Sequence, residues 1–480
     1  MGASDFLYKG FTERLGYEPT PCQDALFRDI SGFLTSDDGD IMVVNGYAGT
    51  GKTTAIAAVV AHLRSVKVPC VLLAPTGRAA KVLGSYTGSD AYTIHKHIYR
   101  QKSTSDSGFG LFTISPNKAK DTLFIVDEVS LIGIGSSEGK STAQFGTGNL
   151  LEDLITFVRS GVGCRMILVG DAAQLPPVGL DRSPALSREY MALAGGVRFS
   201  TLTTVVRQQK ASGILENATR LREMIASGTD LLPADGLGLR TDGFDDFLRV
   251  SGGTLLEELG DAYSRYGEDE TIVLCRSNKR ANRYNAGIRA QIHYKEERLV
   301  RGDRLMIVKN CYQFIENIKN MSYIANVDMA TLLRIGSYED RYGLHFAEAR
   351  LMFPDYDNQE ITAKVCLDTL ESEAPSLTYE QQNALYAGVL EDYSGLSTKK
   401  KRHDAVREDK YYNALQLKYA AAITAHKPQG GQWKCVFIDN PFWQDVLTLD
   451  DLKWLYTAIT RGVEKVYLIN FKDNLFAQTK

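Results

Sequence analysis

The chain has 480 residues, of which 44% are hydrophobic and 24% charged, an ordinary composition for a globular protein of about three domains. This excludes a small binding module and a mainly disordered scaffold, and no apolar run reaches the roughly 18 residues of a membrane-spanning helix. Lys and Arg total 55 against 58 for Asp and Glu, and the formal charge of −3 argues against a protein that passively coats nucleic acid. The N-terminus has no apolar signal core, so we expect an intracellular, cytoplasmic chain with no membrane partner.

The seven cysteines and seven histidines form no recognisable metal site. The cysteines are scattered, with no CxxC pair, which indicates small buried side chains in a reducing compartment. His95 and His97 lie close together, but no zinc-binding arrangement accompanies them.

Strand-like apolar runs alternate with helical patterns in the first half, which is typical of a parallel sheet. The predicted strands are 41–45, 68–74, 123–126 and 165–169, and the predicted helices lie near 22–34, 52–64, 77–83 and 150–159. Continuously apolar runs such as 71–74 indicate burial on both faces of the sheet. The same alternation returns later, with strands at 271–275, 436–439 and 466–470 and helices near 278–291 and 449–460. We therefore expect two doubly wound α/β units.

Three other segments interrupt these units. Residues 296–370 contain short strand-like runs without long helices, which predicts a small β domain, followed by a helix at 378–393 and a basic run at 399–410. An insert at 84–120 is rich in Ser and Gly, and its segment 107–115 reads as a hairpin or loop. The Gly-rich stretch 133–148 is longer than any motif requires.

A phosphate-binding loop, GYAGTGKTT at residues 46–54, follows a predicted strand and opens a helix, as the GxxxxGK[ST] motif requires. Its glycines let backbone N–H groups point at phosphate oxygens, and the helix N-terminus adds positive potential. Lys52 can reach the β and γ phosphates, and the Thr53 hydroxyl can bind Mg²⁺. The predicted nucleotide-binding residues of this loop are Gly46, Ala48, Gly49, Thr50, Gly51, Lys52, Thr53 and Thr54.

An acidic pair completes the predicted phosphate site. The apolar strand 123–126 delivers Asp127 and Glu128 at its carboxyl end. Asp127 would hold Mg²⁺ together with Thr53, and Glu128 would polarise the attacking water. An acidic pair at a strand end is unremarkable alone, but downstream of a phosphate-loop lysine it indicates nucleotide hydrolysis.

Gln23 allows two readings. Its amide could bind both N6 and N7 of adenine. The sequence Thr20-Pro21-Cys22-Gln23 is also a capping box, with Thr20 as the N-cap and Pro21 at the first helical position. The two readings are compatible.

Further segments decide which class of ATPase this is. GDAAQLPPVG (170–179), LTTVVRQQ (202–209), ITAHKPQGGQWKCVFID (423–439) and LYTAITR (455–461) resemble, in order and spacing, motifs III to VI of superfamily 1 helicases. LAPTGRAA (73–80) and YTIHKHI (92–98) resemble motifs Ia and Ic of the RecD/Dda-type branch. The resemblance covers nearly the whole chain.

The resemblance implies an α/β fold with two RecA-like P-loop domains, a small hairpin or loop insert and an SH3-like β-barrel insert. The implied boundaries are 1–84 and 121–205 for the first RecA-like domain, 85–120 for a wedge insert, 206–295 and 411–480 for the second RecA-like domain, and 296–410 for the barrel with its helical, basic extension. The wedge would carry Phe109 or Phe112 at its tip, although a plain loop is the alternative. The helix at 378–393 and the basic run at 399–410 resemble in position the projecting extension, called the tower, of Dda-type helicases. A solvated run of charges is the alternative.

The resemblance also implies roles for individual residues. Gln174 would sense the γ-phosphate, and Arg207 and Arg461 would stabilise charge at the transferring phosphoryl group. Gly430 would join the nucleotide site. The implied DNA contacts are Thr76, His95, Asn278, Thr424, His426 and Lys427.

Several aromatic and motif residues stay ambiguous. His95 would stack on a base or pack locally, and the three tryptophans, Trp433, Trp443 and Trp454, read as core residues or as stacking platforms. The chain departs from the family pattern at Pro428, where Ser or Ala is usual, and at Gln432, which replaces the Glu expected near the ribose.

The implied activity is an ATP- and Mg²⁺-dependent helicase that moves 5′ to 3′ on single-stranded DNA and unwinds duplex at junctions, acting as a monomer near the nucleoid or in viral replication. The alternative is a single-strand-stimulated ATPase subunit of a recombination or nuclease complex that does not unwind by itself. RNA stays open as a track, because no residue is seen to read a 2′-hydroxyl.

Overall fold

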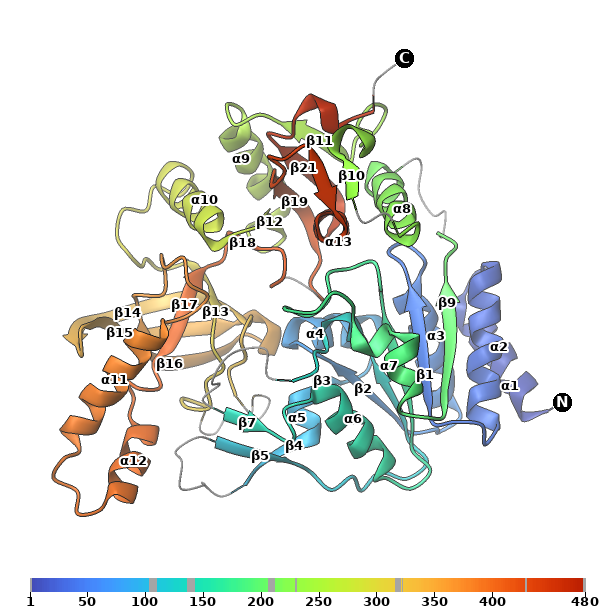
Figure 1. Ribbon diagram of the computed structural model, residues 1–480, viewed down its shortest axis with the longest axis horizontal. Coiled ribbons are helices and arrows are strands. Elements are labelled where there is room, and N and C mark those ends of the chain that lie inside the picture. The colour runs from blue at the N-terminus through green and yellow to red at the C-terminus, as the bar shows by residue number, and fades with distance from the viewer. Residues whose placement is uncertain are drawn as a thin grey trace.

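The computed structural model describes residues 2–102, 110–135, 143–205, 212–228, 231–315, 321, 323–427 and 430–477. Two parallel sheets, each flanked by helices, lie beside a closed barrel and a small three-stranded sheet (Figure 1). This confirms the predicted fold class. Within the described ranges, every helix is too short or too polar to cross a membrane.

The first domain is built on a six-stranded parallel sheet of order β3-β2-β6-β8-β1-β9. Its strands are β1 (Ile41–Gly46), β2 (Cys70–Ala74), β3 (Ala91–Thr93), β6 (Leu123–Val126), β8 (Arg165–Gly170) and β9 (Val197–Leu202). Its helices are α1 (Ala3–Leu15), α2 (Pro21–Thr35), α3 (Lys52–Ser65), α4 (Gly77–Thr87), α5 (Ile94–Ile98), α6 (Leu150–Arg159) and α7 (Arg188–Ala192). Met42 and Val44 of β1 pack in the core with α1, α2 and α3, whereas Ile41 and Val43 pack in the core with α5 and α6. Both faces of the sheet are therefore buried, as the unbroken apolar runs predict.

The second domain has a five-stranded parallel sheet of order β11-β21-β19-β12-β18. Its strands are β11 (Phe247–Val250), β12 (Thr271–Cys275), β18 (Ala422–Thr424), β19 (Trp433–Asp439) and β21 (Gly462–Ile469), and β10 (Leu231–Pro233) pairs with β20 (Val446–Thr448) beside it. Its helices are α8 (Gly213–Ala226), α9 (Leu255–Tyr266), α10 (Asn278–Gln291) and α13 (Leu449–Ile459). Trp433 and Trp454 are fully buried in the core of this domain, which agrees with the interpretation of these two as core residues. Trp443 is 66% exposed.

The barrel closes in the order β13-β14-β15-β16-β17 and is inserted between α10 and β18. Its strands are β13 (Arg304–Ile307), β14 (Met329–Arg341), β15 (Leu344–Phe353), β16 (Gln359–Cys366) and β17 (Leu415–Tyr419). The helices α11 (Tyr379–Asp392) and α12 (Lys399–Glu408) project from it, at lower left in Figure 1. Lys399, Lys400 and Lys401 are exposed on α12, as expected for a solvated charge run. Because β17 completes the barrel, the barrel extends beyond the predicted boundary at residue 410.

The small sheet consists of β4 (Tyr99–Lys102), β5 (Gly110–Ile114) and β7 (Ala143–Phe145). β4 pairs antiparallel with β5, which agrees with the hairpin alternative for 107–115, but β7 comes from the Gly-rich stretch 133–148. In addition, β3 and α5 lie within the range 85–120 although β3 is the edge strand of the first domain's sheet. The predicted insert boundaries therefore differ from the structure at both ends.

Phe112 is not at a tip of this small sheet. Its ring stacks on Phe145, with centroids 4.5 Å apart, and lies 5.0 Å from Tyr312 of the barrel insert. The other candidate tip, Phe109, lies outside the described residues. The side chain of Phe112 thus joins the small sheet to the barrel.

We predict that Leu351→Ala destabilises the barrel by about 2–5 kcal/mol, because Leu351 is completely buried in the barrel core and its loss leaves a cavity. Amide hydrogen exchange of the barrel strands measures this loss separately from the other domains. Tyr338→Ala on β14, where the side chain is 51% exposed, should change exchange little. Equal protection in the Leu351 and Tyr338 variants would contradict the assignment of the core.

Candidate functional site

The phosphate loop connects β1 to α3 at the carboxyl edge of the first sheet. Gly49 and Gly51 both have φ of 75°, a conformation that L side chains rarely adopt. A Cβ on Gly49 would also lie 2.7 Å from the Leu215 side chain of α8 in the second domain. The loop is closed by the Thr50 hydroxyl, which donates to the carbonyl of Tyr47 at 2.7 Å. The sequence GYAGTGKTT therefore forms a compact turn that touches the second domain.

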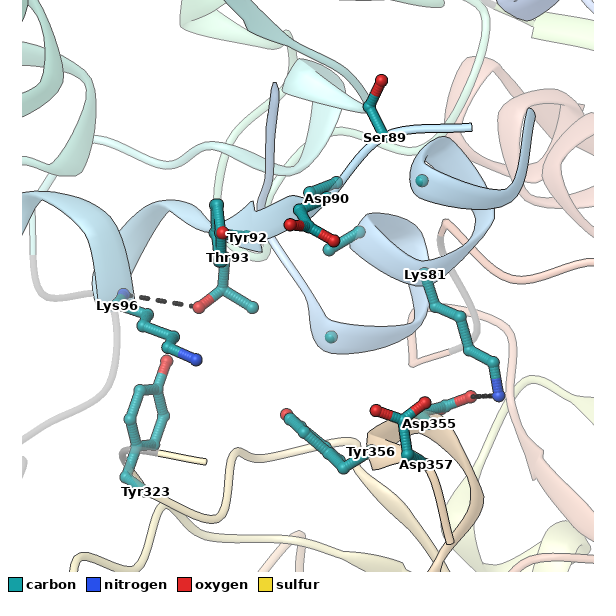
Figure 2. A pocket seen from close by; sticks show the side chains of 14 residues that line it. Lys81, Ser89, Asp90, Tyr92, Thr93, Lys96, Tyr323, Asp355, Tyr356 and Asp357 are labelled. Carbon is teal, nitrogen blue, oxygen red and sulfur yellow. Dashed lines mark hydrogen bonds and ion pairs between the residues drawn. The ribbon is translucent and has the colours of Figure 1, made fainter. Parts of the chain in front are cut away.

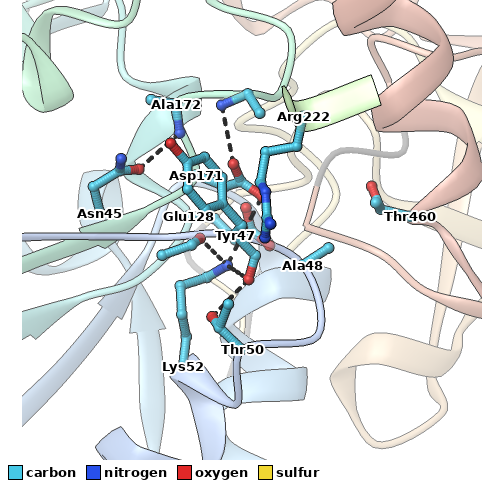
Figure 3. Close-up of polar contacts among 12 residues, drawn as sticks. Asn45, Tyr47, Ala48, Thr50, Lys52, Glu128, Asp171, Ala172, Arg222 and Thr460 are labelled. Carbon is cyan, nitrogen blue, oxygen red and sulfur yellow. Dashed lines mark hydrogen bonds and ion pairs between the residues drawn. The ribbon is translucent and has the colours of Figure 1, made fainter. Parts of the chain in front are cut away.

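Lys52 begins α3, and its ammonium group turns back over the loop (Figure 3). It donates to the carbonyl oxygens of Gly46 and, at 3.1 Å, Tyr47. Its Nζ lies 3.9 Å from the Asp171 carboxylate, which follows β8 and is almost fully buried. A cation thus lies over the loop, where phosphate oxygens would need it.

Asp127 and Glu128 follow β6, two strands away from β1 on the same sheet edge. Glu128 has a left-handed backbone, with φ of 54°, and its N–H donates to the Asp127 carboxylate at 2.8 Å. Burial, and then the charge of Glu128, raise the pKa of Asp127 to about 7. Two adjacent carboxyl groups of this kind suit a divalent cation, which would favour the ionised form of Asp127.

Gln23 is completely buried and forms the predicted capping box. Its Oε1 accepts from the Thr20 N–H at 3.1 Å, and its Nε2 donates to the Thr50 carbonyl at 3.3 Å. Both ends of the amide are therefore engaged within the protein. Gln23 braces the phosphate loop, and its contact with adenine stays a prediction.

The remaining residues predicted to act on the nucleotide lie in different segments of the chain. Gln174 is buried beside Asp171, and its Oε1 has no hydrogen-bond partner among the described residues. Arg461 is 3% exposed and donates to the carbonyls of Thr457 and Gly431, both at 3.2 Å, so its guanidinium is held within the second domain. Thr53 and Thr54 lie in the first turn of α3. Arg207 lies outside the described residues.

Gly430 packs against the N-terminal end of α4. A Cβ on Gly430 would be 2.7 Å from Cβ of Ala79 and 3.5 Å from the hydroxyl of Thr76, both next to or within α4. Gly430 thus lies beside a predicted DNA contact, and its place in the nucleotide site stays a prediction. Its φ of 79° explains why glycine stands there. Pro428, before it, lies outside the described residues.

Contacts between the two parallel-sheet domains, absent from the predicted site, hold the two domains together. The Tyr456 hydroxyl of α13 accepts from the Ala48 N–H at 2.9 Å and donates to Asp171 at 2.7 Å. Arg222 of α8 lies with its guanidinium 4.8 Å from the Tyr47 ring. Tyr456 and Asp171 lie within the motifs LYTAITR and GDAAQLPPVG, but motif spacing gives no sign that they meet.

The predicted DNA contacts lie on both parallel-sheet domains. Thr76 caps α4 by accepting from the Ala79 N–H at 3.2 Å, and Asn278 donates to the Glu373 carbonyl at 3.0 Å. His95 packs against Tyr99 and Phe145, and burial lowers its pKa to about 4, which agrees with local packing. Burial also lowers the pKa of His426, which follows β18 together with Lys427, whereas Thr424 is the last residue of β18. Their contact with DNA stays a prediction.

A cavity of about 430 Å³ lies between the first domain and the barrel insert (Figure 2). Tyr323 and Tyr356 face it from the barrel side, and Lys81, Thr93 and Lys96 face it from the first domain. Lys81 bridges the two sides, since its Nζ donates to the Pro354 carbonyl at 2.7 Å and lies 3.6 Å from Asp355. The barrel is thus attached to the same α4 that carries Thr76 at its N-cap.

Comparisons with known proteins agree with these motifs. Residues 23–236 match the family described as AAA domain, and residues 419–469 match the UvrD-like helicase C-terminal domain. The chain is 35% identical over 178 residues to the ATP-dependent RecD2 DNA helicase of Deinococcus radiodurans, covering 37% of this chain but only 21% of that protein. It is 25% identical over 450 residues to the ATP-dependent DNA helicase dda of Enterobacteria phage T4, covering 89% of this chain and 94% of that protein.

Among solved structures, the Bacteroides Pif1 helicase in complex with ADP-AlF3 and ssDNA aligns with a TM-score of 0.46 at 16% identity, over 97% of this chain and 95% of that one. The two family matches together contain every residue of the predicted nucleotide site.

We predict that Asp127 contributes a loss of first-domain stability as the pH rises from about 4 to about 7 in metal-free buffer, opposite in sign to the contribution of His95, whose pKa burial lowers from 6.5 to about 4. The pKa of Asp127 is raised from 3.8 to about 7, so in this window the folded protein holds a proton that the unfolded chain has released. Asp127→Asn should remove this contribution, so that the unfolding midpoint rises more with pH than in the unaltered protein, and Asp37→Asn, at an exposed carboxylate of the same domain, should not change the profile. An equally steep profile in Asp127→Asn would contradict the assignment.

Proposed function

Because the chain belongs to the superfamily 1 helicases of the RecD/Dda type, we propose that it is an ATP-dependent DNA helicase that moves 5′ to 3′ along single-stranded DNA and unwinds duplex. One observation carries the proposal: the phosphate loop, the acidic pair and the segment Asp171–Gln174 meet at one sheet edge, and α13 of the second domain closes on them. A nucleotide at this edge would touch both domains. Its hydrolysis would therefore change how they fit together.

The residues of the first domain suit ATP as substrate. The loop N–H groups and the N-terminus of α3 favour phosphate, and Lys52 is already held over the loop. Thr53 and Asp127 would hold Mg²⁺, which when bound neutralises charge that develops on the phosphate oxygens. Glu128, next to Asp127, would orient and polarise the attacking water. Gln174, with its buried Oε1 lacking a partner among the described residues, would respond to the γ-phosphate.

The second domain would supply positive charge from across the cleft. Arg461 and Arg207 would stabilise the transferring phosphoryl group, as arginine fingers do. Arg461 would first exchange its contacts with Thr457 and Gly431 for contacts with phosphate oxygens. That exchange would couple the chemical step to a movement of α13.

DNA would cross both parallel-sheet domains on the side of α4 and α10. Thr76 and His95 would contact it in the first domain, and Asn278, Thr424, His426 and Lys427 in the second. Small polar donors of this kind position a phosphate backbone without reading its sequence. The polarity follows the family, and we propose that the protein acts as a monomer on single-stranded DNA and its junctions with duplex.

We predict that single-stranded DNA stimulates ATP hydrolysis and that Lys52→Ala reduces turnover by a factor on the order of 10²–10³, because an electrostatic contact to the phosphates is lost. Lys9→Ala, at a lysine 63% exposed on α1, is the matched control and should hydrolyse normally. Steady-state phosphate release, with and without oligo(dT), measures both effects. Hydrolysis indifferent to DNA would contradict the proposal.

We predict that the protein displaces the strand of a 5′-tailed duplex and leaves a 3′-tailed duplex intact. Strand displacement with fluorescently labelled duplexes, at equal ATP and Mg²⁺, measures this preference. Brisk ATP hydrolysis without displacement would favour a translocating ATPase that unwinds only with a partner. An RNA tail of the same length tests whether the track must be DNA.

A further inference from the structure

The Tyr456 hydroxyl links the phosphate loop to the second domain. Tyr456 lies in the middle of α13 and is 1% exposed. Its hydroxyl accepts from the Ala48 N–H at 2.9 Å, a backbone donor inside the phosphate loop. Burial raises the pKa of Tyr456 well above its ordinary value, so the hydroxyl stays protonated. It donates a hydrogen bond to the Asp171 carboxylate at 2.7 Å.

The Asp171 carboxylate holds the other end of this link. One of its oxygens accepts from the Ala173 N–H at 3.0 Å, and the other accepts from Tyr456 and lies 3.9 Å from the Lys52 ammonium. Asp171 is 1% exposed, so these contacts form in a medium where charge is weakly screened. Ala48, Lys52, Asp171 and Tyr456 therefore form one connected polar set across the cleft.

The donors in this set are the groups that a phosphate requires. A phosphate-binding loop works through its backbone N–H groups and its lysine. The Ala48 N–H is a single donor, so a phosphate oxygen and the Tyr456 hydroxyl would compete for it. Lys52 is likewise held by Asp171 and by loop carbonyls. A phosphate entering the loop would replace protein oxygens at both donors.

We propose that Tyr456 is a positioning residue whose hydroxyl competes with a nucleotide phosphate for the Ala48 N–H, so that nucleotide binding releases α13. This inference rests on the proposed function. It names Tyr456 as the side chain through which nucleotide binding would change the contact between the phosphate loop and the second domain. Arg461 lies five residues after Tyr456 and is bonded to the carbonyl of Thr457 in the same helix. Release of Tyr456 would therefore free α13, to whose C-terminal end Arg461 is bonded, and departure of the phosphate would restore the contact.

The test uses the full-length protein and a fluorescent, slowly hydrolysed ATP analogue in the absence of DNA. Tyr456→Phe keeps the buried ring but removes the competing hydroxyl, so we expect it to bind the analogue about threefold to tenfold more tightly, the change for one net hydrogen bond. We also expect its stimulation by single-stranded DNA to fall by about the same factor. Unchanged or weaker analogue binding would overturn the proposal, because the hydroxyl would then be neutral or would contact the nucleotide itself.

Tyr263→Phe is the matched control. The Tyr263 hydroxyl of α9 is buried without a hydrogen-bond partner among the described residues, so its removal should change neither binding nor stimulation. Equal thermal unfolding midpoints for the two variants would show that the comparison concerns binding. A Tyr263→Phe effect as large as that of Tyr456→Phe would overturn the proposal.

A double-mutant cycle with Asp171→Asn tests the link itself. Asn at position 171 weakens the contacts with both Lys52 and Tyr456. In the Asp171→Asn variant, Tyr456→Phe should therefore change the affinity for the ATP analogue by less than about twofold, which is a non-additive result. Fully additive effects would overturn the coupling. The affinity for the ATP analogue is measured without DNA. If DNA failed to stimulate ATP hydrolysis, the proposed function would be contradicted, but the measured competition between Tyr456 and the nucleotide would still hold.

Discussion

The parallel pairing of β1, β6 and β8 is the constraint on which the rest of the structure depends. Parallel strands end at one edge, so the phosphate loop after β1, the acidic pair after β6 and Asp171 after β8 meet although 125 residues separate the first from the last. The pairing requires burial on both faces, which the alternating side chains of β1 provide. Any change that shifted these registers would separate the groups over the phosphate loop.

Much of this arrangement follows from local sequence. Strands such as 123–126 and 271–275 and the helices at 150–159 and 278–291 have the predicted bounds, because their apolar patterns and caps are local signals. The small sheet was harder to predict, because β7 pairs with β5 across about 30 residues of chain and a three-residue strand carries little pattern. The barrel's last strand, β17, falls within the range predicted for the second domain for a similar reason, since two helices separate it from β16.

The site shows the same division between local and distant signals. Lys52, Asp127 and Glu128 could be recognised from motifs, because each motif is a loop whose chemistry is encoded nearby. The partners of Gln23, Gly430 and Tyr456 could not, because each contact joins segments far apart in sequence. Gln23 illustrates this well: its capping role is local and predictable, whereas its bond to the Thr50 carbonyl depends on how α2 packs beside the loop.

The order of strands in the second sheet has a consequence for synthesis of the chain. β11 ends at Val250, but β21, its partner in the sheet, begins at Gly462. The first domain can therefore fold while the ribosome is still translating, whereas β11 cannot pair with β21 until Gly462–Ile469 have emerged. The barrel strands lie between α10 and β18 in the chain, so the barrel can close in this interval, before β21 is available. Ribosome-bound chains that lack β21 would therefore expose the edge of β11 that β21 later covers.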